Sequence, residues 1–258
     1  MRVNLPAEFL VRPIAHRAWH DLAKGRPENS LAAVRAAVAV GYGIEIDVQP
    51  SSDGVPMVFH DDDLERMTGV KGLIRERTAA ELAELRLAGT GEKIPTLDEV
   101  LNAVSRRVPL LIEIKDQDGA LGHKVGPLEV AVAQALRNYR DQVAVMSFNP
   151  YALMAVRHEN RGLPLGLVTC TFKPEDWPGV PTERLDQLRR MEDWETNLIA
   201  AGFVSHEWTD LRAKQVAEIK MRGAKILAWT VRNMSEDRTA RTVAHNVTFE
   251  GYAAPLLG

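Results

Sequence analysis

The sequence predicts an α/β protein of the (β/α)8 TIM-barrel class. Short apolar runs alternate with helix-like segments about eight times along the chain, the pattern of a parallel sheet covered by helices. No Gly-x-Gly-x-x-Gly follows any predicted strand, so nothing favours a doubly wound nucleotide-binding sheet. The 258 residues are the length of one such barrel. We therefore expect a single domain over residues 1–258, with a small insertion at 61–95 after the second strand.

The alternation begins with an apolar run over residues 11–16, which predicts the first strand. The first helix is expected over residues 31–41, because apolar residues recur there at helical spacing and a glycine stands at its end. Either Asn29 or Ser30 can cap its N-terminus. Two strands follow, and the second of them ends at His60.

The strand predicted over residues 43–49 has a polar face that a barrel strand rarely carries. Its residues alternate strictly, so successive side chains point to opposite faces. Strands of a parallel sheet covered on both sides are apolar nearly throughout, and two inward-facing carboxylates therefore need a reason. The apolar face comprises Ile44, Ile46 and Val48, and the polar face comprises Glu45, Asp47 and Gln49.

Residues 61–95 are less regular than the rest, and we interpret them as an insertion or a lid-like excursion with a short helix near 79–85. From Thr96 the alternation resumes, and Glu99 three residues later completes a capping-box pattern at the start of a helix. The remaining helices are expected over residues 96–105, 127–139, 150–160, 182–193, 211–222 and 235–244. The remaining strands are expected over residues 108–115, 143–148, 163–169, 199–205, 225–230 and 247–250.

Composition and charge argue against several classes of protein. Apolar residues make up 45% and charged residues 26% of the chain, which is ordinary for a soluble globular protein. The net charge of −3 and the lack of a Lys/Arg cluster argue against a nucleic-acid partner. The most apolar run is too short to span a bilayer, the N-terminus lacks the apolar stretch of a signal peptide, and the single cysteine forms no internal disulfide. We expect a cytoplasmic protein without stable membrane insertion, and its oligomeric state stays open.

Polar side chains gather where four of the predicted strands end. In such barrels the active site lies at the C-terminal ends of the strands. Glu113 and Lys115 are two residues apart and so share a strand face, as Glu45 and Asp47 do. The four groups are His16 with Arg17, Glu45 with Asp47, His60, and Glu113 with Lys115.

The three acids predict a metal site. Two carboxylates about 5 Å apart repel by about 3 kcal/mol at an effective dielectric of about 20, so three converging acids cost on the order of 10 kcal/mol unless protonated, paired or metal-bound. Arg17 and Lys115 offset part of this repulsion, and a divalent cation offsets more. Oxygen donors without cysteine favour a hard ion. We expect Mg²⁺ or Ca²⁺ as the cofactor, held by Glu45, Asp47 and Glu113.

The two histidines complete the equipment for cleaving a phosphodiester. Imidazole titrates near neutrality, which suits general acid–base catalysis by His16 and His60. One of them deprotonates the attacking oxygen and the other protonates the leaving alcohol, and the residues do not assign which does which. The cation neutralises developing negative charge, while Arg17 and Lys115 hold the non-bridging phosphate oxygens.

Several short motifs occur in the order and with the spacing of a known family. They are His16-Arg17, Pro27-Glu28-Asn29-Ser30, Glu45-x-Asp47, Asp53-Gly54, His60-Asp61 and Glu113-x-Lys115. The chain thereby resembles the glycerophosphodiester phosphodiesterase family, densely over residues 11–116 and more thinly afterwards, where Trp229-Thr230-Val231 matches a late Trp-containing strand. The resemblance implies a TIM barrel that hydrolyses a small glycerophosphodiester with Mg²⁺ or Ca²⁺ and with the site residues in the roles given above. We expect Trp229 in the core, where at the barrel mouth it can also pack against the alcohol part of the substrate.

The chain departs from the family pattern at two places. Family members usually have glycine after the His-Arg pair, whereas this chain continues Ala18-Trp19-His20, which we expect to place a bulky loop beside the site. The usual acidic residue and proline near the last strand are replaced by Thr248-Phe249-Glu250-Gly251, where Glu250 is a candidate stand-in.

Two other functions stay open on the residues alone. A lysophospholipase D-like or phospholipase C-like phosphodiesterase would act on an intact lipid, and it would carry an interfacial apolar loop or a basic patch, neither of which is evident. A catalytically silent barrel would only bind phosphorylated metabolites. Cys170 and the other histidines are expected to be structural, although two of the histidines, His20 and His206, can border the site. These other histidines are His20, His123, His158, His206 and His245.

Overall fold

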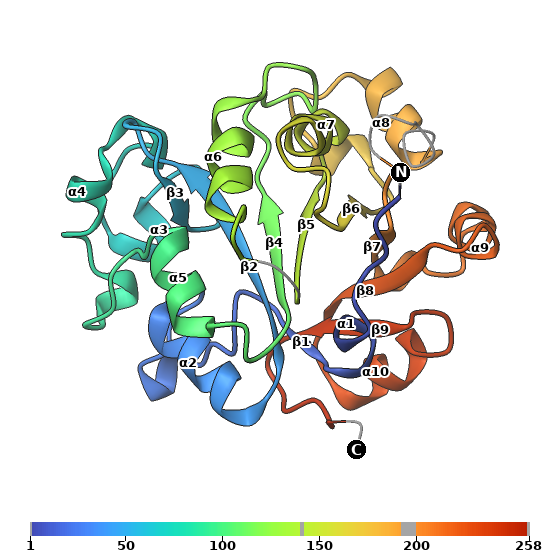
Figure 1. Cartoon of the computed structure of the whole chain (residues 1–258), viewed down its shortest axis with the longest axis horizontal. Coiled ribbons are helices and arrows are strands. Elements are labelled where there is room, and N and C mark those ends of the chain that lie inside the picture. The colour runs from blue at the N-terminus through green and yellow to red at the C-terminus, as the bar shows by residue number, and fades with distance from the viewer. Residues whose placement is uncertain (1, 140–141, 192–199, 257–258) are drawn as a thin grey trace.

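The computed structural model describes residues 2–139, 142–191 and 200–256, which form a closed barrel of parallel strands (Figure 1). Each strand pairs with the next around the ring, and β1 pairs with both β2 and β9, which closes it. The TIM-barrel prediction is confirmed. The barrel strands are β1 (Ile14–Ala15), β2 (Gly43–Pro50), β4 (Leu110–Ile114), β5 (Val143–Ser147), β6 (Leu165–Thr169), β7 (Phe203–Glu207), β8 (Lys225–Val231) and β9 (Asn246–Phe249).

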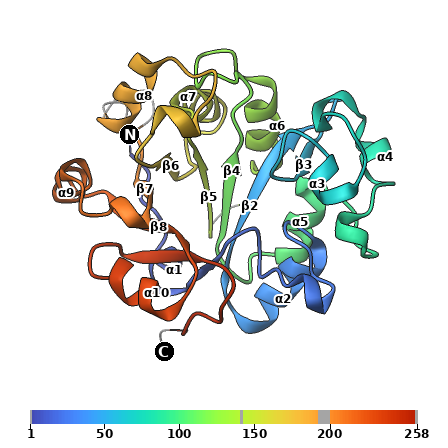
Figure 2. The same ribbon diagram turned by 180° about the vertical axis from the view of Figure 1, so that it is seen from behind.

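Helices cover the outside of the barrel, and Figure 2 shows the same ring from the back. The capping box predicted at Thr96 and Glu99 is present. Of the two candidate caps before the first long helix, Ser30 is the one used, because its hydroxyl accepts a hydrogen bond from the amide of Ala33 at 3.1 Å. The helices around the ring are α2 (Leu31–Val40), α5 (Leu97–Val104), α6 (Pro127–Ala135), α7 (Pro150–Glu159), α8 (Thr182–Arg189), α9 (Lys214–Met221) and α10 (Met234–Ala240).

The strand that leads to His60 is not a barrel strand, and the expectation that His60 stands at the end of one is wrong. This strand, β3 (Pro56–Val58), pairs antiparallel with the end of β2, with Val48 opposite Val58. The physical reason is the short connection, a tight turn with Gly54 at φ 81°, which can join only antiparallel strands. His60 therefore enters from a hairpin that extends beyond the barrel.

The first predicted strand is also shorter than expected. Of residues 11–16 only two pair in the sheet, because Glu8–Val11 forms the short helix α1 and Pro13, which has no amide hydrogen, follows it. Phe9 on α1 is fully buried in the same apolar cluster as the barrel-interior residues Ile14 and Leu227. The N-terminal residues thus supply part of the barrel core and not a longer strand.

Three predicted helices end early, and one of them, expected over residues 235–244, stops as α10 at Ala240. The helix expected over residues 127–139 stops as α6 at Ala135, and the chain then turns so that the Tyr139 hydroxyl accepts a hydrogen bond from the Arg106 amide at 2.9 Å. The helix expected over 182–193 ends as α8 at Arg189. The last two residues of that prediction, and the first residue of the strand expected over 199–205, lie outside the described residues.

Apolar side chains fill the barrel interior. Phe203 on β7 occupies the space next to Gly166 on β6, where an added Cβ would lie 2.2 Å from the Phe203 ring. A glycine is therefore required at this close approach. The other apolar residues of this interior cluster include Leu111, Ala144, Met146 and Val168.

Residues 61–95, here the 61–95 segment, form a compact unit beside β3, outside the ring of strands in both Figure 1 and Figure 2. The segment and the β3 hairpin share an apolar cluster separate from the barrel core, built from Met57, Phe59, Leu64, Met67, Ile74, Leu82, Leu87 and Ile94. Its elements are α3 (Glu65–Thr68), η2 (Ile74–Glu76), α4 (Ala79–Leu82) and η3 (Leu87–Gly89). Within the described part of the chain, no helix combines the length and the apolar character that a bilayer crossing requires.

Candidate active site

The C-terminal ends of the barrel strands surround a cavity of about 180 Å³. Every residue that the sequence singled out for chemistry lines it, from β1, β2, β4, β8 and the β3 hairpin. The structure thus brings together residues that are up to 213 positions apart (229 − 16) in the chain. The lining comprises His16, Arg17, Glu45, Asp47, His60, Glu113, Lys115, Met146, Phe148, Val168, Trp229, Thr230, Arg232 and Thr248.

Three buried carboxylates converge at the floor of this cavity. Glu45, Asp47 and Glu113 each offer an oxygen within 4.8 Å of the others, and Asp47 and Glu113 are direct partners across the β2–β4 pairing. Burial raises the pKa of Glu45 well above its ordinary value, and the charges of Asp47 and Glu113 raise it further. Oε1 of Glu45 is buried and has no hydrogen-bond partner. Three buried carboxylates, one of which has an oxygen without a hydrogen-bond partner, are suited to bind a divalent cation such as Mg²⁺ or Ca²⁺.

Two cationic side chains lie against the same acids. Nζ of Lys115 is 2.8 Å from Oε1 of Glu113 and 3.5 Å from Oδ1 of Asp47. Nε of Arg17 is 3.6 Å from Oδ2 of Asp47. Burial by itself would raise the pKa of Asp47, but the positive charges, that of Lys115 foremost, lower it to about 2. The pKa of Lys115 is raised by Glu113 and Asp47 in spite of its burial, so this amine stays charged.

Asn29, a candidate helix cap in the sequence, holds Asp47 instead. Its Nδ2 donates to Oδ2 of Asp47 at 3.0 Å, and its Oδ1 accepts from the Asp47 amide at 3.3 Å. The backbone of Asn29 lies in the left-handed region at φ 57°, a conformation that asparagine tolerates better than most residues. The loop after β1 therefore orients one of the three acids.

His16 has a carboxylate partner that the sequence left as a candidate. Nδ1 of His16 lies 2.6 Å from Oε2 of Glu250, just after β9. The hydrogen bond from His16 and the His20 ring, whose Nε2 lies 3.7 Å from Oε2, hold the pKa of Glu250 far below its usual range. This carboxylate therefore accepts, and Nδ1 of His16 carries the proton. Burial lowers the pKa of His16, although the bond to Glu250 partly raises it. The neutral ring keeps an unprotonated Nε2.

Glu250 is also held by a residue that sequence reasoning missed. Nε of Arg232 lies 2.8 Å from Oε1 of Glu250, and Arg232 lines the cavity. Its only sequence signal is its position directly after the Trp229-Thr230-Val231 strand.

His60 has the corresponding arrangement with its sequence neighbour. Nδ1 of His60 lies 2.6 Å from Oδ1 of Asp61, and Asp61 is held in turn by Arg66. Arg66 also binds Glu28, which accepts a hydrogen bond from Arg17 at 2.8 Å. Sequence reasoning did not assign a role to Asp61, Glu28 or Arg66. The first two stand in motifs that carried the family resemblance, which was the available signal.

Aromatic side chains line one wall of the cavity. Nε1 of Trp229 donates to the Ser205 carbonyl at 3.0 Å, which fixes the indole. The Phe148 ring packs edge-on against Trp229 and against Trp177, with centroid distances of 5.6 and 5.0 Å. This wall is suited to the apolar part of a small molecule bound beside the acids.

The loop Ala18-Trp19-His20 follows directly after His16 and Arg17. The Trp19 ring packs edge-on against Tyr42 at 5.3 Å, and the Arg26 guanidinium stacks over it at 4.7 Å. Neither Trp19 nor His20 is among the described residues that line the cavity. Trp19 thus packs on the barrel, whereas Nε2 of His20 lies 3.7 Å from Oε2 of Glu250, so the loop stands beside the site without lining its cavity.

Two other candidates, His206 and Cys170, are buried away from this cavity. His206 is fully buried, with Nδ1 2.8 Å from the Thr169 hydroxyl and Nε2 3.3 Å from Asp210, and it does not line the cavity. Cys170 is buried, and burial raises the pKa of its thiol to about 12.

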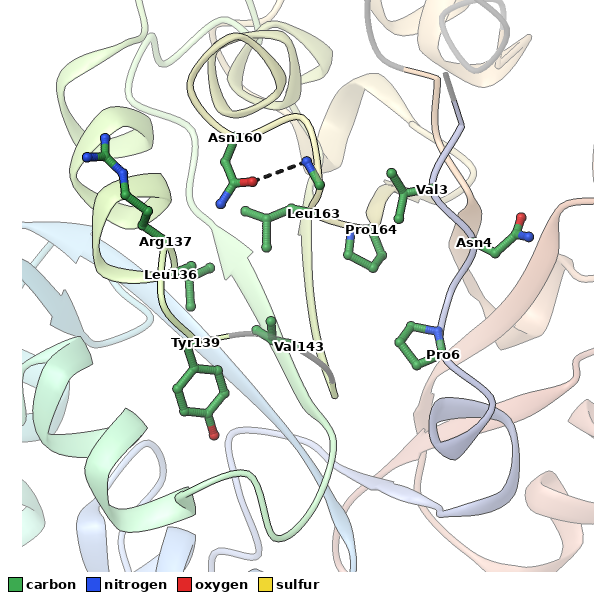
Figure 3. A pocket seen from close by; sticks show the side chains of 11 residues that line it. Val3, Asn4, Pro6, Leu136, Arg137, Tyr139, Val143, Asn160, Leu163 and Pro164 are labelled. Carbon is green, nitrogen blue, oxygen red and sulfur yellow. Dashed lines mark hydrogen bonds between the residues drawn. The ribbon is translucent and has the colours of Figure 1, made fainter.

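A larger hollow of about 430 Å³ lies away from these residues (Figure 3). It is bounded by the N-terminal segment, by the end of α6 and by the starts of β5 and β6. At its border the Gly162 amide donates a hydrogen bond to the Asn160 side chain. Its described lining has no histidine and no carboxylate. The groups that could do acid–base or metal chemistry are in the smaller cavity.

The comparisons with known proteins bear on the family and on the fold. The profile of the glycerophosphoryl diester phosphodiesterase family matches residues 16–246. The glycerophosphodiester phosphodiesterase of Caldanaerobacter subterraneus is 30% identical over 229 residues, covering 84% of each chain. A phosphodiesterase of Oleispira antarctica, solved in complex with the product sn-glycerol-3-phosphate, superposes with a TM-score of 0.74 at 28% identity over 94% of this chain and 93% of its own. A glycerophosphodiester phosphodiesterase of Thermotoga maritima shares the fold, with a TM-score of 0.69 at 24% identity over 92% of this chain and 94% of its own.

Proposed function

The chain belongs to the glycerophosphoryl diester phosphodiesterase family, and on this premise we propose that it hydrolyses glycerophosphodiesters to glycerol 3-phosphate and an alcohol, with a divalent cation and two histidines. One observation carries the proposal. His16 and His60, each hydrogen-bonded at Nδ1 to a carboxylate 2.6 Å away, line one cavity together with the converging acids Glu45, Asp47 and Glu113.

Glu45, Asp47 and Glu113 would hold the cation. Their oxygens lie close enough to share one ion, and the unpartnered Oε1 of Glu45 supports this assignment. When bound, the ion neutralises negative charge that develops on the phosphate. Carboxylate oxygens are ligands for both Mg²⁺ and Ca²⁺.

Arg17 and Lys115 bind the phosphate. Both are charged, both line the cavity, and both are oriented by the acids that they contact. Guanidinium and ammonium groups are suited to the non-bridging oxygens of a phosphodiester, and they favour the extra charge of the transition state. Phe148 and Trp229 then face the alcohol part.

The two histidines divide the proton transfers by their surroundings. His16 is the more deeply buried, its pKa is lowered by that burial, and its Nδ1 proton is engaged by Glu250, so Nε2 serves as the base. His60, with a side chain 30% exposed, donates its Nε2 proton to the leaving oxygen. As the new P–O bond forms, the attacking oxygen loses its proton to His16. As the old P–O bond breaks, the alcohol oxygen gains one from His60.

The test is a panel of substrates assayed with and without added metal. We expect turnover of glycerophosphocholine and glycerophosphoethanolamine to disappear after dialysis against EDTA and to return with Mg²⁺ or Ca²⁺. Titration calorimetry should show binding of the ion to wild type and its loss in Glu113→Gln. Full activity in EDTA would contradict the metal role, and faster turnover of lysophosphatidylcholine would favour an intact lipid as the substrate.

A further inference from the structure

Arg66 connects the two halves of the site from outside the cavity. It lies on α3 in the 61–95 segment and does not line the cavity. Its guanidinium forms paired contacts with two carboxylates. Nε and Nη2 lie 2.5 and 3.1 Å from the two oxygens of Asp61. Nη2 and Nη1 lie 2.6 and 3.0 Å from the two oxygens of Glu28.

Each of these carboxylates leads directly to a residue of the site. Asp61 accepts the Nδ1 proton of His60 at 2.6 Å, on the same Oδ1 that faces Nη2 of Arg66. Glu28 accepts from Nη1 of Arg17 at 2.8 Å, on the same Oε1 that faces Nη2 of Arg66. A continuous row of charged hydrogen bonds therefore runs from His60 to Arg17, with Arg66 at its centre.

The arrangement is more specific than an ordinary surface ion pair. An isolated exposed pair contributes only about 0–1 kcal/mol and leaves both partners free to move. Here the planar guanidinium of Arg66 binds two carboxylates and holds them in a fixed relative orientation. A lysine ammonium cannot do this, because its compact charge does not present two parallel pairs of N–H groups. Arg66 and His60 hold the pKa of Asp61 far below its usual value, and Arg66 and Arg17 lower that of Glu28, so both stay ionised in spite of partial burial.

We propose that Arg66 is a positioning residue for the protonation of the leaving alcohol. It orients Asp61, which aims the Nε2–H of His60 at the leaving oxygen, and it steadies Arg17 through Glu28. The proposal rests on the proposed function, with His60 as the acid. In the step concerned the P–O bond to the alcohol breaks, its electron pair stays on that oxygen, and the proton moves there from His60. Arg66 itself exchanges no proton.

This role makes the effect of Arg66 depend on the leaving group. A choline alkoxide is strongly basic and needs a proton as it departs, whereas 4-nitrophenolate leaves without one. A residue that acts only on stability or on phosphate binding would affect both substrates alike. The experiment therefore compares glycerophosphocholine with the 4-nitrophenyl ester of sn-glycerol 3-phosphate in wild type, Arg66→Gln, Arg66→Lys and His60→Ala.

General acid catalysis contributes about 10²–10⁴-fold, and a misdirected acid forfeits part of it. We expect Arg66→Gln to lower kcat about 30-fold on glycerophosphocholine and less than about threefold on the nitrophenyl ester, with a similar rise in KM on both. Arg66→Lys should recover little. Arg241→Gln is the matched control, because Nε of Arg241 lies 2.6 Å from Asp237 in a comparable pair that does not line the cavity. It should leave both rates unchanged.

An equal loss of kcat on the two substrates, in folded Arg66→Gln and Arg66→Lys, would overturn the proposal, as would unchanged turnover. In the His60→Ala background, Arg66→Gln should cause no further loss of kcat on glycerophosphocholine, because the acid it positions is gone. A second loss of the same size would also overturn it. Failure of the proposed function is distinguishable, because wild type would then cleave neither substrate.

Discussion

The two histidines of the site are held by different parts of the molecule. His16 follows β1, and its carboxylate partner Glu250 follows β9, 234 residues away. The two are brought together by the β1–β9 pairing, in which Ala15 lies opposite Phe249. His60 follows a hairpin strand, and its partner is the adjacent Asp61, held by Arg66 of the 61–95 segment.

The difference shows that only one half of the site depends on closure of the barrel. Without the β1–β9 pairing His16 would lose Glu250, whereas His60 and Asp61 are neighbours in any conformation. The orientation of the second pair depends instead on the packing of the 61–95 segment, which shares an apolar cluster with the β3 hairpin. His16, whose side chain is 16% exposed, is suited to accept a proton, and His60, at 30%, to exchange one with solvent.

The largest expected effect on kcat comes from His16, the histidine that depends on closure of the barrel. His16→Ala should lower kcat by about 10²–10⁴-fold, because the base that activates the attacking oxygen is lost. The loss should be the same for glycerophosphocholine and for the nitrophenyl ester, since neither leaving group replaces a base. Steady-state rates on both substrates check this. A loss confined to glycerophosphocholine would reverse the roles of the two histidines.

A smaller effect is expected from loosening the segment that supports His60. Leu82→Ala removes a fully buried side chain from the apolar cluster of the 61–95 segment and should reduce the free energy of unfolding by about 2–5 kcal/mol. Hydrogen exchange should accelerate mainly in this segment. The matched variant is Leu111→Ala in the barrel interior, which should accelerate exchange in the strands. Uniform acceleration in both variants would show that the two regions unfold as one unit.

The smallest effect on catalysis is expected from Glu250, the carboxylate partner of His16. Glu250→Gln should lower kcat/KM about tenfold, since the glutamine still occupies the place but no longer stabilises the charged imidazole. Glu250 raises the pKa of His16, so its removal should lower that pKa further. Because the base works unprotonated, the acidic limb of the pH profile should move to lower pH. A limb that stays in place or moves up would contradict the pairing of Glu250 with the base.

The sequence by itself determined the barrel and most of the chemical groups. Strand and helix alternation is a local property, and so is the side-chain period of two that puts Glu45 with Asp47 and Glu113 with Lys115 on one face. Caps such as Thr96 with Glu99 are equally local. These patterns could be read without knowing which strands are neighbours.

Only the tertiary structure decided the contacts between segments. The register that sets Asp47 opposite Glu113, the closure that delivers Glu250 to His16, and the docking of Arg66 against Glu28 join residues that no local period relates. The tertiary structure also decided that Asn29 binds Asp47 and that Ser30 caps α2. The reason is physical: side-chain alternation follows from the backbone of one strand, whereas pairing and closure depend on how all strands and helices pack together.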